Sequence, residues 1–323
     1  MSKFHGLYAD LLDQYISFKR SMGYKFTDAE SVYGRFDRFT VELGESEIGI
    51  KKELADQWAQ KRPNETDSTC YRRVLYLIHF ILFIKDMGYP SYIPKLPRSY
   101  KSTFTPHIFS KEEINSIFQA CDILESYHSM NSSDFAMPAL LRMLYGTGIR
   151  IGEALTLRVK DVDFNDNYLT IHQSKNGKER MIPFSETLSE VCQQYRNSLK
   201  ISCQIDDFFF VKQNGYGCTS KAIYNYFRKI LWIAGISHGG RGLGPRIHDF
   251  RHTFSVHTLA KMSEQGLDLY YSLPILSEYL GHQSLEATEK YVRLTSEMYP
   301  GMLLEVNSIC SYVFPELIND ENN

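Results

Sequence analysis

The feature that most constrains the fold is a proline-rich segment that ends the first third of the chain. This segment, residues 89–106, contains four prolines, namely Pro90, Pro94, Pro97 and Pro106. Proline lacks a backbone N–H and disfavours helix in the residue before it, so the segment can be neither a helix nor a central strand. It divides the 323 residues into two parts that are each long enough to bury a core. We therefore predict two domains joined by an extended linker, residues 89–107.

The part before the linker has the pattern of a helical bundle. Apolar side chains recur at helical spacing over residues 7–22. Thr27 and Glu30 form a capping-box pattern that predicts the start of a second helix. With a short helix around Trp58 and a long one over residues 68–88, we expect four helices, which is enough for a small bundle.

The part after the linker mixes helices with a few strands. Ser110 and Glu113 form a second capping box, and helical patterns follow as far as Tyr145. Three short strands are then predicted, over residues 159–164, 168–173 and 179–183, with turns between them. After Ser185 the pattern is helical again. The predicted fold class is mainly α with a small antiparallel β-sheet (α+β).

The total charge hides local imbalance. Lys plus Arg is 36 and Asp plus Glu is 38, a net charge of -2 that excludes a uniformly basic nucleic-acid coat but not a basic face. The linker carries Lys95, Arg98 and Lys101 without an acid, and residues 221–261 carry seven basic residues, Arg241 and Arg246 among them, against one acid. These stretches suit a phosphate backbone, although a solvated linker explains the first equally well.

Nothing in the sequence predicts a membrane or secreted protein. No apolar run reaches the roughly 18 residues that span a bilayer, and acidic and polar residues appear too early for a secretory signal. The six cysteines are scattered without a CxxC pair. We therefore expect a reducing, cytoplasmic location.

Four segments carry residues suited to chemistry: GTGIRIGE (146–153), SKNG (174–177), HDFRH (248–252) and LGH (280–282), the last followed by Tyr291. Taken singly, each has an ordinary explanation. Arg150 could pair with Glu153, Lys175 could be a solvated hairpin lysine, and Tyr291 could be a packing residue. His248 and His252 have the i, i+4 spacing of metal ligands, but the arginine between them would repel a cation.

Taken together, the segments supply a complete set of groups for attack on a phosphodiester. Two arginines and a histidine can offset the charge of the transition state, and a lysine can protonate the leaving oxygen. A tyrosine is a poor nucleophile until cationic neighbours or a base activate it. No carboxylate cluster suited to a metal accompanies them.

In order and spacing, these segments resemble the tyrosine recombinase (phage-integrase) family, which includes the Xer recombinases and lambda integrase. The resemblance covers most of residues 109–294. The family's TGxRxxE segment matches residues 147–153, and its hairpin lysine before a KER-like run matches Lys175. The HxxRH box matches residues 248–252, and LGH followed by the nucleophile matches His282 and Tyr291.

The resemblance implies a role for each residue. Tyr291 would form a 3′-phosphotyrosine, while Arg150, Arg251 and His282 would stabilise the transition state. His248 would bind the phosphate or move a proton, Lys175 would protonate the leaving oxygen, and Glu153 would orient Arg150. Neither metal, ATP nor any other cofactor is implied.

The resemblance also implies partners and domains. We expect double-stranded DNA with specific recombination sites, and a homotetramer on DNA that exchanges strands through a Holliday junction, with a monomer or dimer free in solution. Lys95, Arg98, Lys101, Arg241 and Arg246 would contact DNA. The expected domains are a core-binding (SAM-like) bundle, residues 1–88, the linker, a catalytic domain, residues 108–299, and a tail, residues 300–323. The resemblance implies the compact two-domain form of an integrase of mobile elements, and we expect it at the bacterial nucleoid. It leaves open whether accessory or co-recombinase proteins take part.

Three alternatives remain at this point. A type IB topoisomerase would use a similar set of residues to relax DNA, and a non-catalytic DNA-binding accessory protein could keep the same fold.

The tail is acidic yet rich in apolar residues. We expect it to pack into a neighbouring protomer, and packing on its own domain is nearly as good an explanation.

Overall fold

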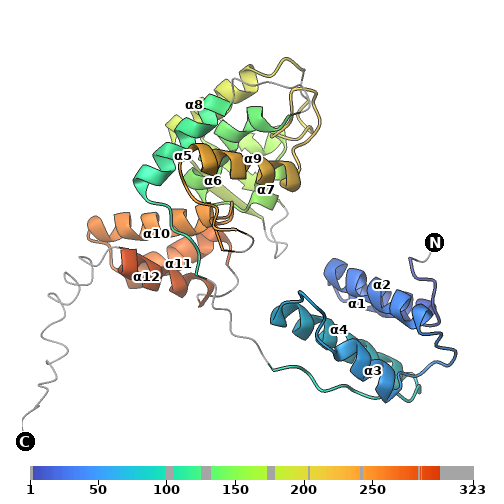
Figure 1. Cartoon of the computed structure of the whole chain (residues 1–323). Helices are drawn as coiled ribbons and strands as arrows, with labels where there is room; N and C mark the ends of the chain where they lie inside the picture. The colour runs from blue at the N-terminus through green and yellow to red at the C-terminus, as the bar shows by residue number, and fades with distance from the viewer. Residues whose placement is uncertain are drawn as a thin grey trace, which may run out of the picture. The chain divides into compact units, whose positions relative to one another are not determined.

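The computed structural model describes residues 3–98, 105–124, 132–172, 179–202, 204–240, 243–282, 284 and 286–298. The chain divides into two compact units, residues 1–104 and 105–323 (Figure 1). The division falls within the proline-rich segment. Each unit has its own hydrophobic core.

The described part of the first unit contains four helices. They are α1 (Ala9–Ser21), α2 (Thr27–Glu42), α3 (Lys52–Ala59) and α4 (Asp67–Asp86). Helix α4 packs against each of the other three, because its inner face is a continuous apolar stripe that includes Leu77, Phe80, Ile81 and Ile84.

The start of α2 differs from the expected capping box. The N-cap is Phe26, in the left-handed conformation with φ 55°, and no side chain caps the helix. Thr27 is already the first helical residue. The ring of Phe26 packs edge-on against Tyr15 and Tyr76. Burial of this ring in the aromatic core, rather than capping by Thr27, therefore sets how the chain enters α2, and the capping-box prediction is wrong.

A buried arginine joins α3 to α4. Arg73 is 1% exposed and pairs with Glu65 at 2.8 Å. Its remaining donors reach the carbonyl oxygens of Trp58 and Gln60. A buried guanidinium needs such partners, because an unpaired charge is costly to keep away from water.

The segment that follows α4 is extended over its described residues, 89–98, with neither helix nor strand. The backbone N–H of Tyr92 donates to the carbonyl of Ile50 at 2.8 Å, which ties its beginning to the first unit. Lys95 and Arg98 are exposed. Lys101 lies outside the described residues.

The second unit contains most of the helices and the sheet. Its helices are α5 (Lys111–Leu124), α6 (Met137–Thr147), α7 (Ile151–Thr156), α8 (Glu186–Asn197), α9 (Ser220–Ile233), α10 (Asp249–Glu264), α11 (Leu269–Leu280) and α12 (Glu286–Met298), with short 3₁₀ turns η1 (Asp134–Ala136) and η2 (Val159–Asp161). The capping box before α5 is confirmed: the N–H of Glu113 donates to Ser110 Oγ at 3.1 Å, and the N–H of Ser110 donates to the Glu113 carboxylate at 2.9 Å.

Helix α6 is the centre of the second unit. It packs against α5, α8 and α10, and Leu140, Leu141 and Met143 on it are fully buried. Helices α10, α11 and α12 pack on one another (Figure 1, orange to red), and α10 joins this group to α6. Helix α6 ends at Gly148, whose φ of 63° and close approach to the Phe254 ring leave no room for a Cβ. This glycine therefore brings the start of α7 beside α10.

The sheet has three antiparallel strands in the order β1–β2–β3. They are β1 (Val162–Asp163), β2 (Tyr168–Ile171) and β3 (Arg180–Pro183). The first strand is shorter than expected, because residues 159–161 form the turn η2. The backbone N–H groups of Val159 and Lys160 donate to the carbonyls of Asp207 and Ile205 rather than to a strand. A mainly α fold with a small antiparallel sheet is confirmed.

No helix in the described ranges is long and apolar enough to cross a membrane. The four cysteines among those residues, Cys70, Cys121, Cys192 and Cys218, are free thiols and buried.

Candidate active site

Arg150 stands at the N-cap of α7, where the sequence places it. Its Nη1 donates to Glu153 Oε1 at 2.8 Å, and its backbone N–H donates to Oε2 at 2.9 Å. Arg180 on β3 donates to the same carboxylate at 2.7 Å. Burial alone would raise the pKa of Glu153, but these hydrogen bonds and charges outweigh it and hold the pKa below its usual value. Glu153 is thus an ionised carboxylate that fixes two guanidiniums.

Arg251 lies in the first turn of α10 and is 2% exposed. It donates to the carbonyls of Gly148 and Leu280, each at 2.7 Å, and to Nε2 of His282 at 3.1 Å. Burial, followed by the charge of Arg150, lowers its pKa to about 10. The group therefore stays cationic at neutral pH and joins the end of α6 to the end of α11.

His282 follows Gly281, which ends α11 in the left-handed conformation with φ 66°. Burial and then the charges of Arg251 and Arg150 lower the pKa of His282 to about 4, so the ring is neutral at pH 7. Because Nε2 accepts from Arg251, the proton is on Nδ1, which donates to Thr288 Oγ1 at 2.7 Å. Thr288 is fully buried on α12, three residues before Tyr291.

Tyr291 is 1% exposed on α12. Its hydroxyl donates to Nδ1 of His252 at 3.2 Å, and its ring stacks on His282 with centroids 6.2 Å apart. Burial raises the pKa of the phenol, while the nearby charge of Arg251 opposes the rise. Burial also lowers the pKa of His252 to about 3, so this imidazole is a neutral acceptor. The phenol is therefore stored protonated and away from solvent.

His248 stands just before α10 and is exposed. Its ring meets that of His252 edge to face, with centroids 5.0 Å apart. Desolvation by the surrounding protein atoms, followed by the charges of Arg251 and Arg150, lowers the pKa of His248 to about 4. His248 is therefore a neutral imidazole at the open side of the cluster, able to accept a proton. Within the described ranges, no group of three His, Cys, Asp or Glu residues is arranged for a metal ion.

The structure gathers most of the expected site residues. Arg150, Glu153, Arg251, His282 and Tyr291 form one cluster, with His248 at its edge. Three expected positions, Lys101, Lys175 and Arg241, lie outside the described residues, as does the tail, residues 300–323. Arg246 is exposed two residues before His248, and its backbone N–H donates to Asp249.

Two members of the cluster are not evident from the sequence. Arg180 belongs to a KER-like run in the sequence, but only the structure shows that its guanidinium bonds to Glu153. Thr288 has no sequence signal, because its role depends on the angle between α12 and the turn after α11. Lys290, next to the tyrosine, places its ammonium 5.3 Å from the Tyr291 ring centroid.

A basic face lies on α9. Six of its exposed residues recur at i, i+3, i+4, i+7, i+8 and i+11, namely Lys221, Tyr224, Asn225, Arg228, Lys229 and Trp232. The helix contains no acid, and Trp232 is 83% exposed. We call these six residues the α9 face; cationic and stacking side chains along one helix suit nucleic acid.

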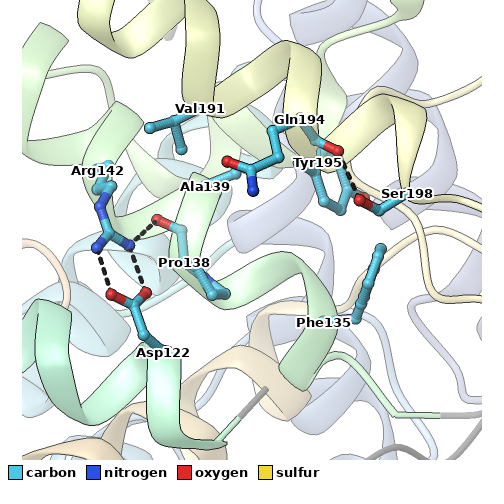
Figure 2. Close-up of a pocket in the computed structure, with 9 residues that line it drawn as sticks. All are labelled: Asp122, Phe135, Pro138, Ala139, Arg142, Val191, Gln194, Tyr195 and Ser198. Carbon is cyan, nitrogen blue, oxygen red and sulfur yellow. Dashed lines mark hydrogen bonds and ion pairs between the residues drawn. The ribbon is translucent and has the colours of Figure 1, made fainter. Parts of the chain in front are cut away.

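A cavity of about 260 Å³ lies between α5, α6 and α8 and shares no residue with the cluster (Figure 2). Figure 2 shows Arg142 among the lining residues. Its side chain donates to Asp122 through both Nη atoms and to the carbonyl of Pro138. Because this guanidinium is already neutralised, the cavity offers little to an anionic backbone.

Comparison with known proteins agrees with the geometry. The pattern of the phage integrase family matches residues 107–298. The chain is 28% identical over 300 residues to the putative integrase/recombinase y4rB of Sinorhizobium fredii, covering 89% of this chain and 93% of that protein. It is 30% identical over 235 residues to tyrosine recombinase XerC of Oceanobacillus iheyensis, covering 70% of each.

Solved structures share the fold. A lambda integrase dimer bound to a COC′ core site has a TM-score of 0.62 at 16% identity, covering 87% of this chain and 94% of that one. The Tn1549 transposon integrase with transposon right end DNA has a TM-score of 0.61 at 19% identity and the same coverage. The resemblance drawn from the four short segments is confirmed: the chain belongs to the phage integrase family of tyrosine recombinases.

Proposed function

We propose that the chain is a site-specific DNA recombinase in which Tyr291 attacks the scissile phosphate and becomes a 3′-phosphotyrosine. The main support is the convergence of Arg150, Arg251, His282 and Tyr291 from α7, α10, the α11–α12 turn and α12. Arg251 contacts His282 at 3.1 Å, and the His282 and Tyr291 rings stack. Relatives named as recombinases support the same reaction.

The chemistry follows from these groups. The phenolic oxygen of Tyr291 forms a bond to phosphorus as the bond to the 5′ oxygen breaks. Arg150 and Arg251 offset the charge on the non-bridging oxygens. Neutral His248 accepts the phenol proton, and Lys175 protonates the leaving oxygen. Because the phosphotyrosine keeps the energy of the broken bond, attack by another 5′ hydroxyl rejoins the strands without ATP.

Tyr291 must leave its buried position before it can attack. Its hydroxyl bonds to His252, and three N–H donors of Arg251 are taken up by two carbonyls and His282. A phosphate at the cluster competes for those donors and attracts the positive charges. DNA binding is therefore part of the activation of the nucleophile.

The contacts with DNA are assigned by charge. In the catalytic domain, residues 108–299, the α9 face, Arg241 and Arg246 contact DNA. Residues 1–88 act as the core-binding domain. In the linker, residues 89–107, Lys95, Arg98 and Lys101 follow the phosphate backbone.

The assembly on DNA is proposed to be a homotetramer that exchanges strands through a Holliday junction. A related fold, lambda integrase, is a dimer on its core site. The tail, residues 300–323, would pack into a neighbouring protomer. If a chain truncated after Pro300 assembles on DNA as the full chain does, this role of the tail is wrong.

The test is covalent trapping on genomic DNA of the organism that encodes the chain. Sheared DNA is incubated with protein and denatured in detergent, and the fragments left on protein are sequenced. The wild-type chain should leave fragments that end at one sequence, and Tyr291→Phe should leave none. Tyr270→Phe is the matched control, because Tyr270 is 87% exposed on α11. An adduct with Tyr291→Phe, or none with the wild type, contradicts the proposal.

The mapped sequence separates recombination from relaxation. A supercoiled plasmid with two copies of the site should yield exchanged products. Relaxation without exchange would favour the topoisomerase alternative. Binding without any cleavage would favour an accessory protein.

A further inference from the structure

Two arginines share the carboxylate of Glu153, but they share it unequally. Arg180, the first residue of β3, donates from Nη2 to Oε2 at 2.7 Å and from Nη1 to Oε1 at 3.2 Å, so it binds both oxygens. The side chain of Arg150 donates only from Nη1, to Oε1 at 2.8 Å. Among the described residues, Nε and Nη2 of Arg150 have no acceptor. Arg180 is therefore the main partner of the carboxylate, and Arg150 keeps donors for another group.

The electrostatics of the pair agree with this division. Burial raises the pKa of Glu153, and among the causes that oppose the rise the hydrogen bond with Arg180 is the largest, ahead of those with Arg150. Glu153 is 4% exposed and Arg180 is 11% exposed, whereas Arg150 is 23% exposed. Attraction between charges is screened least where water is excluded. Glu153 and Arg180 therefore form the strong ion pair, and Arg150 is the member that a ligand can reach.

The guanidinium of Arg180 is also confined by the turn between α11 and α12. A Cβ at Gly281 would lie 3.2 Å from Cδ and Nη1 of Arg180, so this side chain packs against the backbone of the turn. Its Nε is buried and has no acceptor in the part of the chain that the structure describes. Since both of its terminal nitrogens are on Glu153, Arg180 acts on a phosphate only through that carboxylate.

We propose that Arg180 is a positioning residue for Arg150: by neutralising Glu153 it leaves the charge of Arg150 available to the scissile phosphate. This inference rests on the proposed function. Without Arg180, the negative charge of Glu153 would fall on Arg150 alone and would also oppose the phosphate. At an effective dielectric constant of about 20, a unit charge about 7 Å from the phosphate changes a rate by about tenfold or more.

The test varies the charge of the phosphate. Single-turnover cleavage is measured on two nicked duplexes of the mapped site, one with the normal scissile phosphate and one with a methylphosphonate, in which a methyl group replaces a charged non-bridging oxygen. Arg180→Gln should be about tenfold slower than the wild type, or more, on the phosphate. Its loss should be much smaller on the methylphosphonate, which has no charge for Glu153 to oppose. Arg180→Lys keeps the charge and should keep most of the rate.

A double variant separates charge balance from mechanical support. In the wild-type background, Glu153→Gln slows cleavage because Arg150 loses a partner. In the Arg180→Gln background, the same change removes an unbalanced charge, so the double variant should cleave the phosphate faster than Arg180→Gln alone. A double variant that is as slow as Arg180→Gln, or slower, overturns the proposal. A wild-type rate for Arg180→Gln, or an equal loss on the two duplexes, overturns it as well.

The chain offers a matched control at the cavity of Figure 2, which shares no residue with the cluster. Arg142 there also donates to both oxygens of a carboxylate, that of Asp122, and is 22% exposed. Arg142→Gln should cleave both duplexes at the wild-type rate, and a loss equal to that of Arg180→Gln would overturn the proposal. If the wild-type chain does not cleave the phosphate duplex, the proposed function fails. If it cleaves through Tyr291 and the Arg180 results are contradicted, only the positioning role fails.

Discussion

The carboxylate of Glu153 offers the sharpest test of how the site is held. Its side chain is 4% exposed and lies between Arg150, 23% exposed, and Arg180, 11% exposed. Glu153→Gln keeps the size and one carbonyl oxygen but removes the charge. The two guanidiniums are then left with a neutral partner in a partly buried site.

The size of the effect follows from this burial. Breaking a fully buried ion pair costs about 3–5 kcal/mol. Solvent reaches part of Arg150, so we expect a loss of about 2–3 kcal/mol. In a unit of this size each kcal/mol lowers the melting temperature by about 2–4 °C. The transition of the second unit should therefore fall by about 4–12 °C in calorimetry of the full chain.

The dependence on pH distinguishes charge from packing. Because the pKa of Glu153 is lowered in the folded chain, the carboxylate stabilises the fold above its unfolded pKa, near 4.5. This stabilisation disappears as the pH falls through the folded value. The difference between wild type and Glu153→Gln should be complete at pH 7 and shrink below about pH 4.5.

A matched control and a second readout complete the experiment. Glu190→Gln, at an exposed position of α8, should change stability by less than about 0.5 kcal/mol at any pH. Glu153→Gln should also slow cleavage, because Arg150 loses its orienting partner. A difference that persists unchanged below pH 4 would show that packing, not charge, holds these arginines. An unchanged melting temperature at pH 7 would refute the reasoning outright.

Three further predictions concern other parts of the chain. Because the folded pKa of His252 is lowered to about 3, the free energy of unfolding should fall as the pH drops below about 6.5. In urea titrations, His252→Gln should make this dependence on pH weaker. If stability falls with pH equally in the wild type and the variant, the prediction is wrong. Arg228→Ala on the α9 face should reduce the slope of log binding constant against log salt concentration by about one for DNA binding. Lys200→Ala, which is not on that face, should leave the slope unchanged. Equal slopes for the two variants would show that the α9 face does not contact DNA. Arg73→Ala should destabilise the first unit by about 3–5 kcal/mol, which the fluorescence of buried Trp58 would report. The unfolding transition of the second unit should stay in place. A single shifted transition would show that the units do not unfold separately.

The sequence predicts the site better than it predicts the local structure. Arg150, Arg251, His282 and Tyr291 are found from spacing within short segments. For Arg150 and His282, a glycine that ends the preceding helix also marks the position. Gly148 and Gly281 are of this kind, since both adopt the left-handed conformation that ends a helix. The cluster itself could be expected only through the family resemblance.

Details set by tertiary contacts are not predictable in this way. Thr27 has the pattern of a cap, but the ring of Phe26 in the aromatic core determines the start of α2. Residues 159–161 have strand propensity, but hydrogen bonds to residues 205–207, more than forty positions away, turn them into η2. Local propensity differs between such states by less than these contacts contribute.

On the proposed function, the hydrogen bonds around Arg251 indicate what a phosphate would have to change before cleavage. Each contact of its guanidinium is to a protein acceptor: two carbonyls and His282. His282 is neutral and uses its proton on Thr288, so its ring offers no donor to a phosphate in this arrangement, and three of the five N–H donors of Arg251 are already in use. An arriving phosphate is a stronger acceptor than a carbonyl and favours protonated imidazole. It would therefore draw Arg251 outward and leave Nε2 of His282 free to take up a proton and donate. Since Thr288 is on the same helix as Tyr291, the hydrogen bond from Nδ1 of His282 links the phosphate site to the helix that carries the nucleophile.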